Sequence, residues 1–94
     1  MNMENTKTEK WFVADTHFHH NLMLKTRKFK TIKDHNNAVA DSISKVVKPG
    51  DTLYVLGDFS FGGFAKHLMA FDVLLESYNR INPKEKPYQR LPYN

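Results

Sequence analysis

Two apolar runs of strand-forming residues are each followed, within two residues, by a carboxylate. The first, KWFVA at Lys10–Ala14, is followed by Asp15. The second, TLYVL at Thr52–Leu56, is followed by Gly57 and Asp58. Aromatic and β-branched residues favour strands, and a strand that is apolar on both faces is typical of a sheet that helices cover on both sides. The pattern therefore predicts two strands, the first of them buried on both faces.

Between the two runs, apolar residues recur at the spacing of one buried helical face. Asp34 is a candidate N-cap for this helix, and Pro49 followed by Gly50 is a stop signal. The predicted buried face consists of Val39, Ile43, Val46 and Val47, and the polar face of Asn37, Asp41 and Lys45. A separate single turn of helix is expected at residues 22–25.

A longer helix is predicted over residues 64–78, after the second run. Its apolar positions are Phe64, Leu68, Phe71, Leu75 and Tyr78, and its polar side holds Lys66, Asp72 and Glu76. Residues 79–94 contain three of the four prolines and no periodicity, so we expect a Pro-containing C-terminal tail there. Residues 1–9 are polar and unpatterned, which predicts a flexible N-terminus. One domain, residues 10–78, lies between these ends, as expected for 94 residues.

The order strand, helix, strand predicts an α/β fold with a small parallel sheet flanked by helices. A connection of this length most simply joins parallel strands through a right-handed crossover, which places both carboxyl ends at one edge of the sheet. Asp15, His17 and Asp58 are therefore expected to lie together, at the edge where such sheets usually bind ligands.

The composition limits both the location of the chain and the kind of metal site. With 40% hydrophobic and 26% charged residues it is typical of a soluble globular chain. No apolar run approaches the roughly 18 residues of a membrane helix. The polar N-terminal residues lack an apolar signal core, so a cytoplasmic location is expected and a membrane partner is not. Because there is no cysteine, any metal must be held by oxygen and imidazole.

The net charge of +4 is concentrated in one segment. Five cations within nine residues, with no acidic residue among them, are Lys25, Arg27, Lys28, Lys30 and Lys33. Beside a metal site they would attract an anionic substrate, and Lys25, Arg27, Lys28 and Lys30 are the candidate phosphate contacts. The simpler interpretation is a solvated segment that keeps the protein soluble. Nucleic-acid binding through the same cations is a third interpretation.

Asp15, His17 and Asp58 form a suitable ligand set for a divalent cation. Mn²⁺ is our first choice, and Fe, Zn²⁺ and Mg²⁺ are the alternatives. Two ions roughly 3.5–4 Å apart could hold both the attacking and the leaving oxygen of a phosphoryl transfer. Three ligands are too few for two ions, so this chain supplies only part of such a site.

The motifs around these three residues resemble those of a known enzyme family. DTHFHHN follows the first apolar run, and KPGDTLYVLGDFSFG contains the second. Together they are similar to the D-x-H and G-D motifs of the calcineurin-like metallophosphoesterases, in particular the short bacterial and phage members, over roughly residues 10–63. The resemblance implies that Asp15 and His17 bind the first metal and that Asp58 bridges both. It also makes His20, which matches the second histidine of H-F-x-H, a candidate catalytic residue.

The later motifs of the family are absent from this sequence. No G-N-H-D or G-N-H-E and no G-H-x-H follows Asp58, and the last histidine is His67. The sequence therefore resembles the N-terminal half of such an enzyme, a truncated half of its fold. A phosphoesterase of this kind would need a second copy or another subunit to complete its two-metal site.

Two functions of different classes stay open. One is the metal-dependent hydrolysis of a phosphomonoester or phosphodiester, in a homo-oligomer or with a protein partner. The other is a catalytically inactive protein, of phage type, that binds another protein as an inhibitor or regulator. A half-domain leaves part of its sheet uncovered. The candidate partner surface consists of Phe61, Phe64, Leu68 and Tyr78.

The other histidines and aromatic residues have simpler interpretations. His19 could add a ligand or a phosphate contact, although histidines in polar loops are more often inert. His35 and His67 are expected to be structural. The aromatic residues expected in the core are Trp11, Phe12, Phe59 and Phe61.

Overall fold

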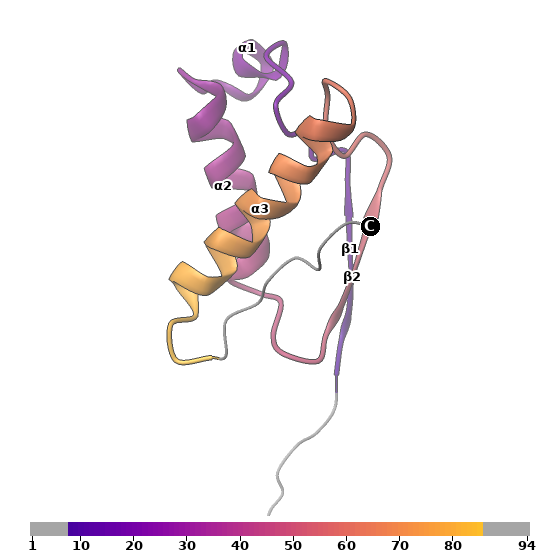
Figure 1. The fold of residues 1–94 in the computed structure, drawn as a ribbon, viewed down its shortest axis with the longest axis vertical. Helices are drawn as coiled ribbons and strands as arrows, with labels where there is room; N and C mark the ends of the chain where they lie inside the picture. The colour runs from indigo at the N-terminus through magenta and orange to yellow at the C-terminus, as the bar shows by residue number, and fades with distance from the viewer. Residues whose placement is uncertain (1–7, 86–94) are drawn as a thin grey trace, which may run out of the picture.

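The computed structural model describes residues 8–85, in which two helices connect the two strands and a third helix follows (Figure 1). The elements are β1 (Lys10–Ala14), α1 (Met23–Arg27), α2 (Ile32–Ser44), β2 (Thr52–Leu56) and α3 (Phe64–Ile81). β1 and β2 form a two-stranded parallel sheet whose register pairs Lys10 with Thr52 and Ala14 with Leu56. The predicted α/β class with a small parallel sheet is confirmed, and both strands end at the same edge.

Helices cover one face of this sheet only, within residues 8–85. In Figure 1, α2 and α3 lie on the same side of the sheet. Residues along both strands alternate between exposed and half-buried. On the open face Phe12 is 67% exposed and stacks on Tyr54, with ring centroids 5.1 Å apart. The prediction that both faces of β1 are buried, with Phe12 in the core, is wrong because no described helix covers the outer face.

The first turn of α2 is capped by Thr31 and not by Asp34. Thr31 has an extended backbone, and its Oγ1 accepts a hydrogen bond from the backbone N–H of Asp34 at 3.1 Å. Asp34 lies instead in the first turn, where a carboxylate is favourable beside the positive end of the helix dipole. The predicted cap is wrong because a threonine side chain can make the same capping bond as an aspartate.

Small and polar side chains form the most buried side of α2. They are His35, Asn36, Ala40 and Ser44. Val39 and Ile43 are half-buried, but Val46 lies beyond the end of the helix and is 43% exposed. The predicted valine face is therefore wrong in part, because α2 packs on α3 through short side chains such as Ser44 and Ser77, whose Oγ atoms are 2.9 Å apart.

α3 continues past Tyr78, where the sequence predicted its end, to Ile81. The backbone and side-chain amides of Asn82 both donate to the carbonyl of Tyr78, at 2.9 and 3.1 Å, and close the helix. The first residues assigned to the predicted tail are thus helical. Residues 1–7 and 86–94, from the predicted N-terminus and tail, lie outside the described residues. None of the helices in residues 8–85 is long and apolar enough to cross a bilayer.

The most deeply buried residues gather near the ends of the strands. Phe18, Ala40 and Ala70 are 0% exposed. The half-buried side chains that pack against them are Val39, Phe59, Val73 and Leu74. Farther along the sheet, an apolar groove of about 450 Å³ lies between β2 and the two long helices, lined in part by Leu53, Val55, Leu74 and Tyr78. The core therefore supports the loops that leave β1 and β2.

The carboxylate of Asp51 fastens the turn before β2 to the start of β1. It accepts hydrogen bonds from the backbone N–H groups of Glu9 and Lys48 and from Nε1 of Trp11, at 2.9, 2.8 and 2.9 Å. These bonds, that from Glu9 first, lower the pKa of Asp51 below its usual value of 3.8. A carboxyl group with a lowered pKa contributes stability that is present above the usual value and is lost as the pH falls through the folded value.

We expect Asp51→Asn to lower the free energy of unfolding at neutral pH and to lower it less at a pH below 3.8. Protonation already weakens the same three bonds in the parent protein at low pH. Urea denaturation at the two pH values measures the difference. Glu76→Gln, which removes an exposed carboxylate of α3, is the control. An equal loss at both pH values would show that the ionised form of Asp51 is not what stabilises the turn.

Candidate metal centre

The loops that follow β1 and β2 are held side by side by backbone hydrogen bonds. The N–H of Asp15 donates to the carbonyl of Leu56 at 2.9 Å, and the N–H of His17 donates to that of Asp58 at 3.0 Å. Phe18 and Ser60 then form an isolated parallel bridge. The strand pairing thus continues past the strand ends and carries the polar residues of both loops to one place.

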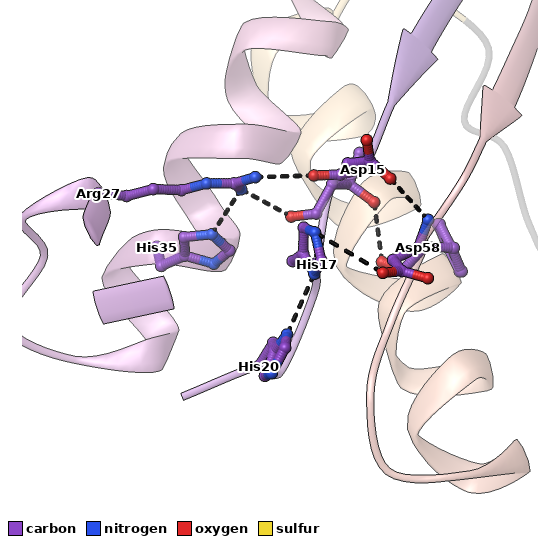
Figure 2. A network of polar contacts seen from close by, with 8 residues as sticks. Asp15, His17, His20, Arg27, His35 and Asp58 are labelled. Carbon is purple, nitrogen blue, oxygen red and sulfur yellow. Dashed lines mark hydrogen bonds and ion pairs between the residues drawn. The ribbon is translucent and has the colours of Figure 1, made fainter. Parts of the chain in front are cut away.

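Asp15, His17 and Asp58 come together there, as the sequence predicts (Figure 2). Each offers one ligand atom, and these atoms all lie within 4.8 Å of one another. Nε2 of His17 is 4.0 Å from Oδ2 of Asp58. The His17 side chain is 17% exposed and that of Asp58 79% exposed, so the cluster opens to solvent. Among residues 8–85, this is the one group of three or more histidines and acidic residues with metal-site spacing.

The Asp15 carboxylate is seated against the backbone of the second loop. Its Oδ1 accepts a hydrogen bond from the N–H of Asp58 at 2.9 Å. Gly57 makes this approach possible, because a Cβ atom there would lie 2.1 Å from Oδ1 of Asp15. Gly57 also has a φ of +71°, in the left-handed region that glycine adopts without strain. A carboxylate offers about four lone-pair sites, so one hydrogen bond leaves it able to bind a cation.

His20 lies behind His17 and outside the ligand cluster. The two Nδ1 atoms are 3.1 Å apart, so one of them donates and the other accepts. His17 presents a free lone pair on Nε2 toward Asp58 only when its own Nδ1 carries the proton and His20 accepts. The ring of His20 stacks on Phe61, with centroids 4.6 Å apart. The candidate catalytic residue is thus placed where it can orient His17, as residues behind a metal ligand commonly do.

The backbone of the first loop has an unusual conformation. Asp15, His17 and His19 have φ values of 55°, 55° and 61°, in the left-handed region that costs a residue other than glycine on the order of 1–3 kcal/mol. The residues between them point inward: Thr16 is 3% and Phe18 0% exposed. Such a conformation persists only where its surroundings hold it, so the side chains around this loop matter for the site.

The basic segment does not act as a single surface. Lys25, Lys28 and Lys30 are exposed, as expected of phosphate contacts. Arg27 is different: its guanidinium donates to the carbonyl oxygens of Asp15 and Thr16. Its donors are therefore directed to the backbone of the loop. The basic composition gave no sign of this, although Arg27 is the one arginine among the five cations of the segment.

The remaining histidines lie apart from the ligand cluster. His35 is fully buried, and Nδ1 of His67 is 2.6 Å from Oγ of Ser60 and 2.9 Å from the carbonyl oxygen of Gly63. Both make the kind of contacts expected of structural histidines. Burial first, and Lys66 second, lower the pKa of His19, which favours the neutral imidazole.

The predicted partner surface is only partly exposed. Phe61 and Phe64 are each 59% exposed, Leu68 is half-buried, and Tyr78 is 7% exposed. Tyr78 therefore belongs to the interior, because it lies on the side of α3 that faces the apolar groove. Phe61 is correspondingly absent from the core, whereas Phe59 packs against it as predicted.

The donor set fits one divalent cation. Two carboxylates and one imidazole are ligands that Mn²⁺, Fe, Zn²⁺ and Mg²⁺ accept to different degrees, and three protein atoms leave coordination positions for water or substrate. Comparison of the chain with protein-family models, with curated proteins and with solved structures gives no match. The function of the chain is therefore inferred from this geometry and from the motifs of the sequence.

Proposed function

We propose that Asp15, His17 and Asp58 bind one divalent metal ion and that the protein is a metal-dependent phosphoesterase. The observation that carries the proposal is the convergence of the three ligand atoms within 4.8 Å, on two loops whose motifs resemble those of the calcineurin-like metallophosphoesterases. On this proposal the chain is a truncated half of that fold. Its substrate is a phosphomonoester or a phosphodiester, and Mn²⁺ is the first metal to test. A cytoplasmic location of the protein, expected from its composition, is part of the same proposal.

The two carboxylates of the site supply negative charge, and His17 supplies a neutral nitrogen when its Nδ1 is protonated. A divalent ion held there would supply the activation of water and the neutralisation of charge on a phosphate. The exposed lysines of the segment before α2 favour the approach of an anionic substrate. Two ions need more ligands than residues 8–85 bring together, so a second copy or another subunit completes the site in this proposal.

A second candidate function is supported by the open surface of the sheet. Phe12, Tyr54 and Leu56 on its outer face are 67%, 42% and 52% exposed, and Phe61 lies in the loop that follows β2. Apolar side chains gathered on one face are typical of a binding surface. In this alternative the protein is an inactive phosphoesterase relative that binds another protein as an inhibitor or regulator.

The test of the metal site is calorimetric titration with Mn²⁺ of the parent protein and of Asp58→Asn. We expect saturable binding of about one ion per chain, lost in the variant, because a carboxamide oxygen is a much poorer ligand than a carboxylate. Glu76→Gln, which removes an exposed carboxylate of α3, should bind as the parent does. Equal binding by Asp58→Asn would place the ion elsewhere.

The same titration separates the two candidate functions. A folded parent protein that binds no Mn²⁺ would favour the protein-binding alternative. If Mn²⁺ binds, hydrolysis of an aryl phosphate or phosphodiester is measured next, together with the mass of the particle in solution. Activity confined to an oligomer or to a complex with another subunit would support completion of the site by a second chain.

A further inference from the structure

The loop from Asp15 to His19 places two of the three proposed ligands, yet three of its residues have left-handed backbones. Hydrogen bonds from outside the loop must therefore select this conformation over less strained ones. The pairing with the second loop supplies some of them. Further hydrogen bonds come from a connected set of side chains on α1 and α2.

Arg27, the last residue of α1, contacts the loop at two consecutive carbonyl groups. Its Nη2 donates to the carbonyl oxygen of Asp15 at 2.7 Å, and its Nη1 donates to that of Thr16 at 2.9 Å. Figure 2 shows the guanidinium facing these two groups on the side of the loop away from Asp58. A planar guanidinium fixes two acceptors in one geometry, which the single ammonium of a lysine does not.

Arg27 is also one end of a chain of hydrogen bonds whose direction is fixed. Nη1 lies 2.9 Å from Nε2 of His35, and because arginine only donates, this nitrogen accepts. His35 must then carry its proton on Nδ1, which lies 3.0 Å from Oδ1 of Asn36. This chain therefore requires the Nδ1–H tautomer of His35.

The bonds at the other end of this hydrogen-bond chain also require Oδ1 of Asn36 to be an acceptor. Oδ1 of Asn36 accepts a hydrogen bond from the backbone N–H of His19 at 3.1 Å, and that group can only donate. Nδ2 of Asn36 is then the donor to Nδ1 of His19, 3.0 Å away. His19 is therefore the Nε2–H tautomer, and every bond from Arg27 to His19 has a donor and an acceptor.

We propose that Arg27 is a positioning residue for the metal centre: it holds the Asp15 and Thr16 carbonyls directly, and the His19 backbone through His35 and Asn36. Hydrogen bonds thus hold the loop at both ends, and His17 lies between them. The part of this proposal that concerns metal affinity rests on the proposed function. The part that concerns the conformation of the loop does not.

Whether Mn²⁺ affinity rises or falls on replacement of Arg27 separates a positioning role from a purely electrostatic one. A cation beside the site repels a divalent ion, so loss of a positive charge alone would leave Mn²⁺ affinity unchanged or raise it. Loss of positioning lowers it, and removal of a group that orients metal ligands typically costs about 10–100-fold in affinity. Arg27→Lys keeps the positive charge but loses the paired donors of the guanidinium. Lys30→Ala removes an exposed cation of the same segment and is the control for charge.

The first experiment is amide hydrogen exchange, followed by NMR, on the parent, Arg27→Lys and Lys30→Ala. We expect Arg27→Lys to speed exchange at the N–H groups of His17 and His19 by about tenfold or more, without the same change at Ala70 in α3. Lys30→Ala should leave all three unchanged. Unchanged exchange at His17 and His19 in Arg27→Lys would overturn the proposal, and so would an equal increase at Ala70, which would indicate support of the whole fold.

Two further measurements complete the test. Imidazole nitrogen shifts of the parent should show Nδ1–H on His35 and Nε2–H on His19, and the opposite tautomer at either would overturn the chain. Calorimetry should show Mn²⁺ binding that is about 10–100-fold weaker in Arg27→Lys. If the parent binds no Mn²⁺, the proposed function fails, while the exchange and tautomer measurements still decide whether Arg27 positions the loop.

Discussion

Phe18→Ala is expected to cost about 3–5 kcal/mol of folding free energy, the usual cost of removing a fully buried phenylalanine ring. Small domains have a total stability on the order of 5–15 kcal/mol, and a chain of this size belongs near the lower end of that range. The variant should therefore be largely unfolded, or close to it, at room temperature.

The reason for so large an effect is the composition of the core. Phe18 is the largest fully buried side chain in the described residues, and its buried neighbours Ala40 and Ala70 are small. Its ring meets that of Phe59 edge to face, with centroids 5.5 Å apart. Side chains this short cannot fill the space that the ring would leave, so the cavity term adds to the loss of buried apolar area.

Phe61→Ala is the matched control, because it removes the same side chain from an exposed position in the neighbouring loop. It loses the stacking contact with His20, which is worth on the order of 0.5–1.5 kcal/mol or less at an exposed site. Urea denaturation followed by circular dichroism measures both variants. Similar losses for Phe18→Ala and Phe61→Ala would mean that the core does not lie beneath the two loops.

The strands and the ligand cluster could be predicted from the sequence because both depend on short-range patterns and one topological rule. An apolar run that ends at a polar residue marks a strand end, and parallel pairing then brings Asp15 and Asp58 to one edge. The burial of each face could not be predicted in the same way. Whether Phe12 is covered depends on where the helices pack. An apolar strand has the same sequence pattern whether or not a helix covers its outer face.

The buried faces of the helices were predicted only in part, for a related reason. Periodicity identified α2 and α3, but the contact between them is made by short and polar side chains such as Ala40, Ser44 and Ser77. A hydrophobicity pattern ranks valine above alanine or serine, so it centres the predicted face on Val39 and Ile43, which are half-buried, and misses Ala40 and Ser44, which are buried. Close approach of two helices depends on side-chain size, which the pattern does not record.

The residues that support the site could not be predicted from the sequence motifs. The sequence predicts a phosphate contact for Arg27 because it lies among lysines, and a catalytic role for His20 because of its place in a motif. No motif or pattern in the sequence indicated a role for Asn36. Their positions depend on hydrogen bonds to backbone groups in left-handed conformations, and such conformations cannot be read from residue types other than glycine with any specificity. Among the positions with positive φ, the sequence predicts a turn only at glycines such as Gly50, and not at Asp15, His17 or His19.

Gly57→Ala is expected to disable the proposed metal centre while the rest of the fold stays intact. The added Cβ would lie 2.1 Å from Oδ1 and 3.0 Å from Cγ of Asp15, so the carboxylate must leave its seat and lose its hydrogen bond to the N–H of Asp58. A left-handed alanine adds strain of about 1–2 kcal/mol. We expect Mn²⁺ affinity to fall by about 10–100-fold or more, as for other changes that misplace a metal ligand.

Gly63→Ala separates the clash from the strain. Gly63 also has a positive φ, of +90°, but a Cβ there would have no neighbour within 4 Å. Both variants should therefore lose stability to backbone strain in urea denaturation, and only Gly57→Ala should lose Mn²⁺ binding in calorimetry. If Gly57→Ala binds Mn²⁺ as the parent does, the seat of Asp15 on the second loop is not what places its carboxylate. If both variants lose binding, the conformation of the whole loop from Gly57 to Gly63, and not one contact, determines the site.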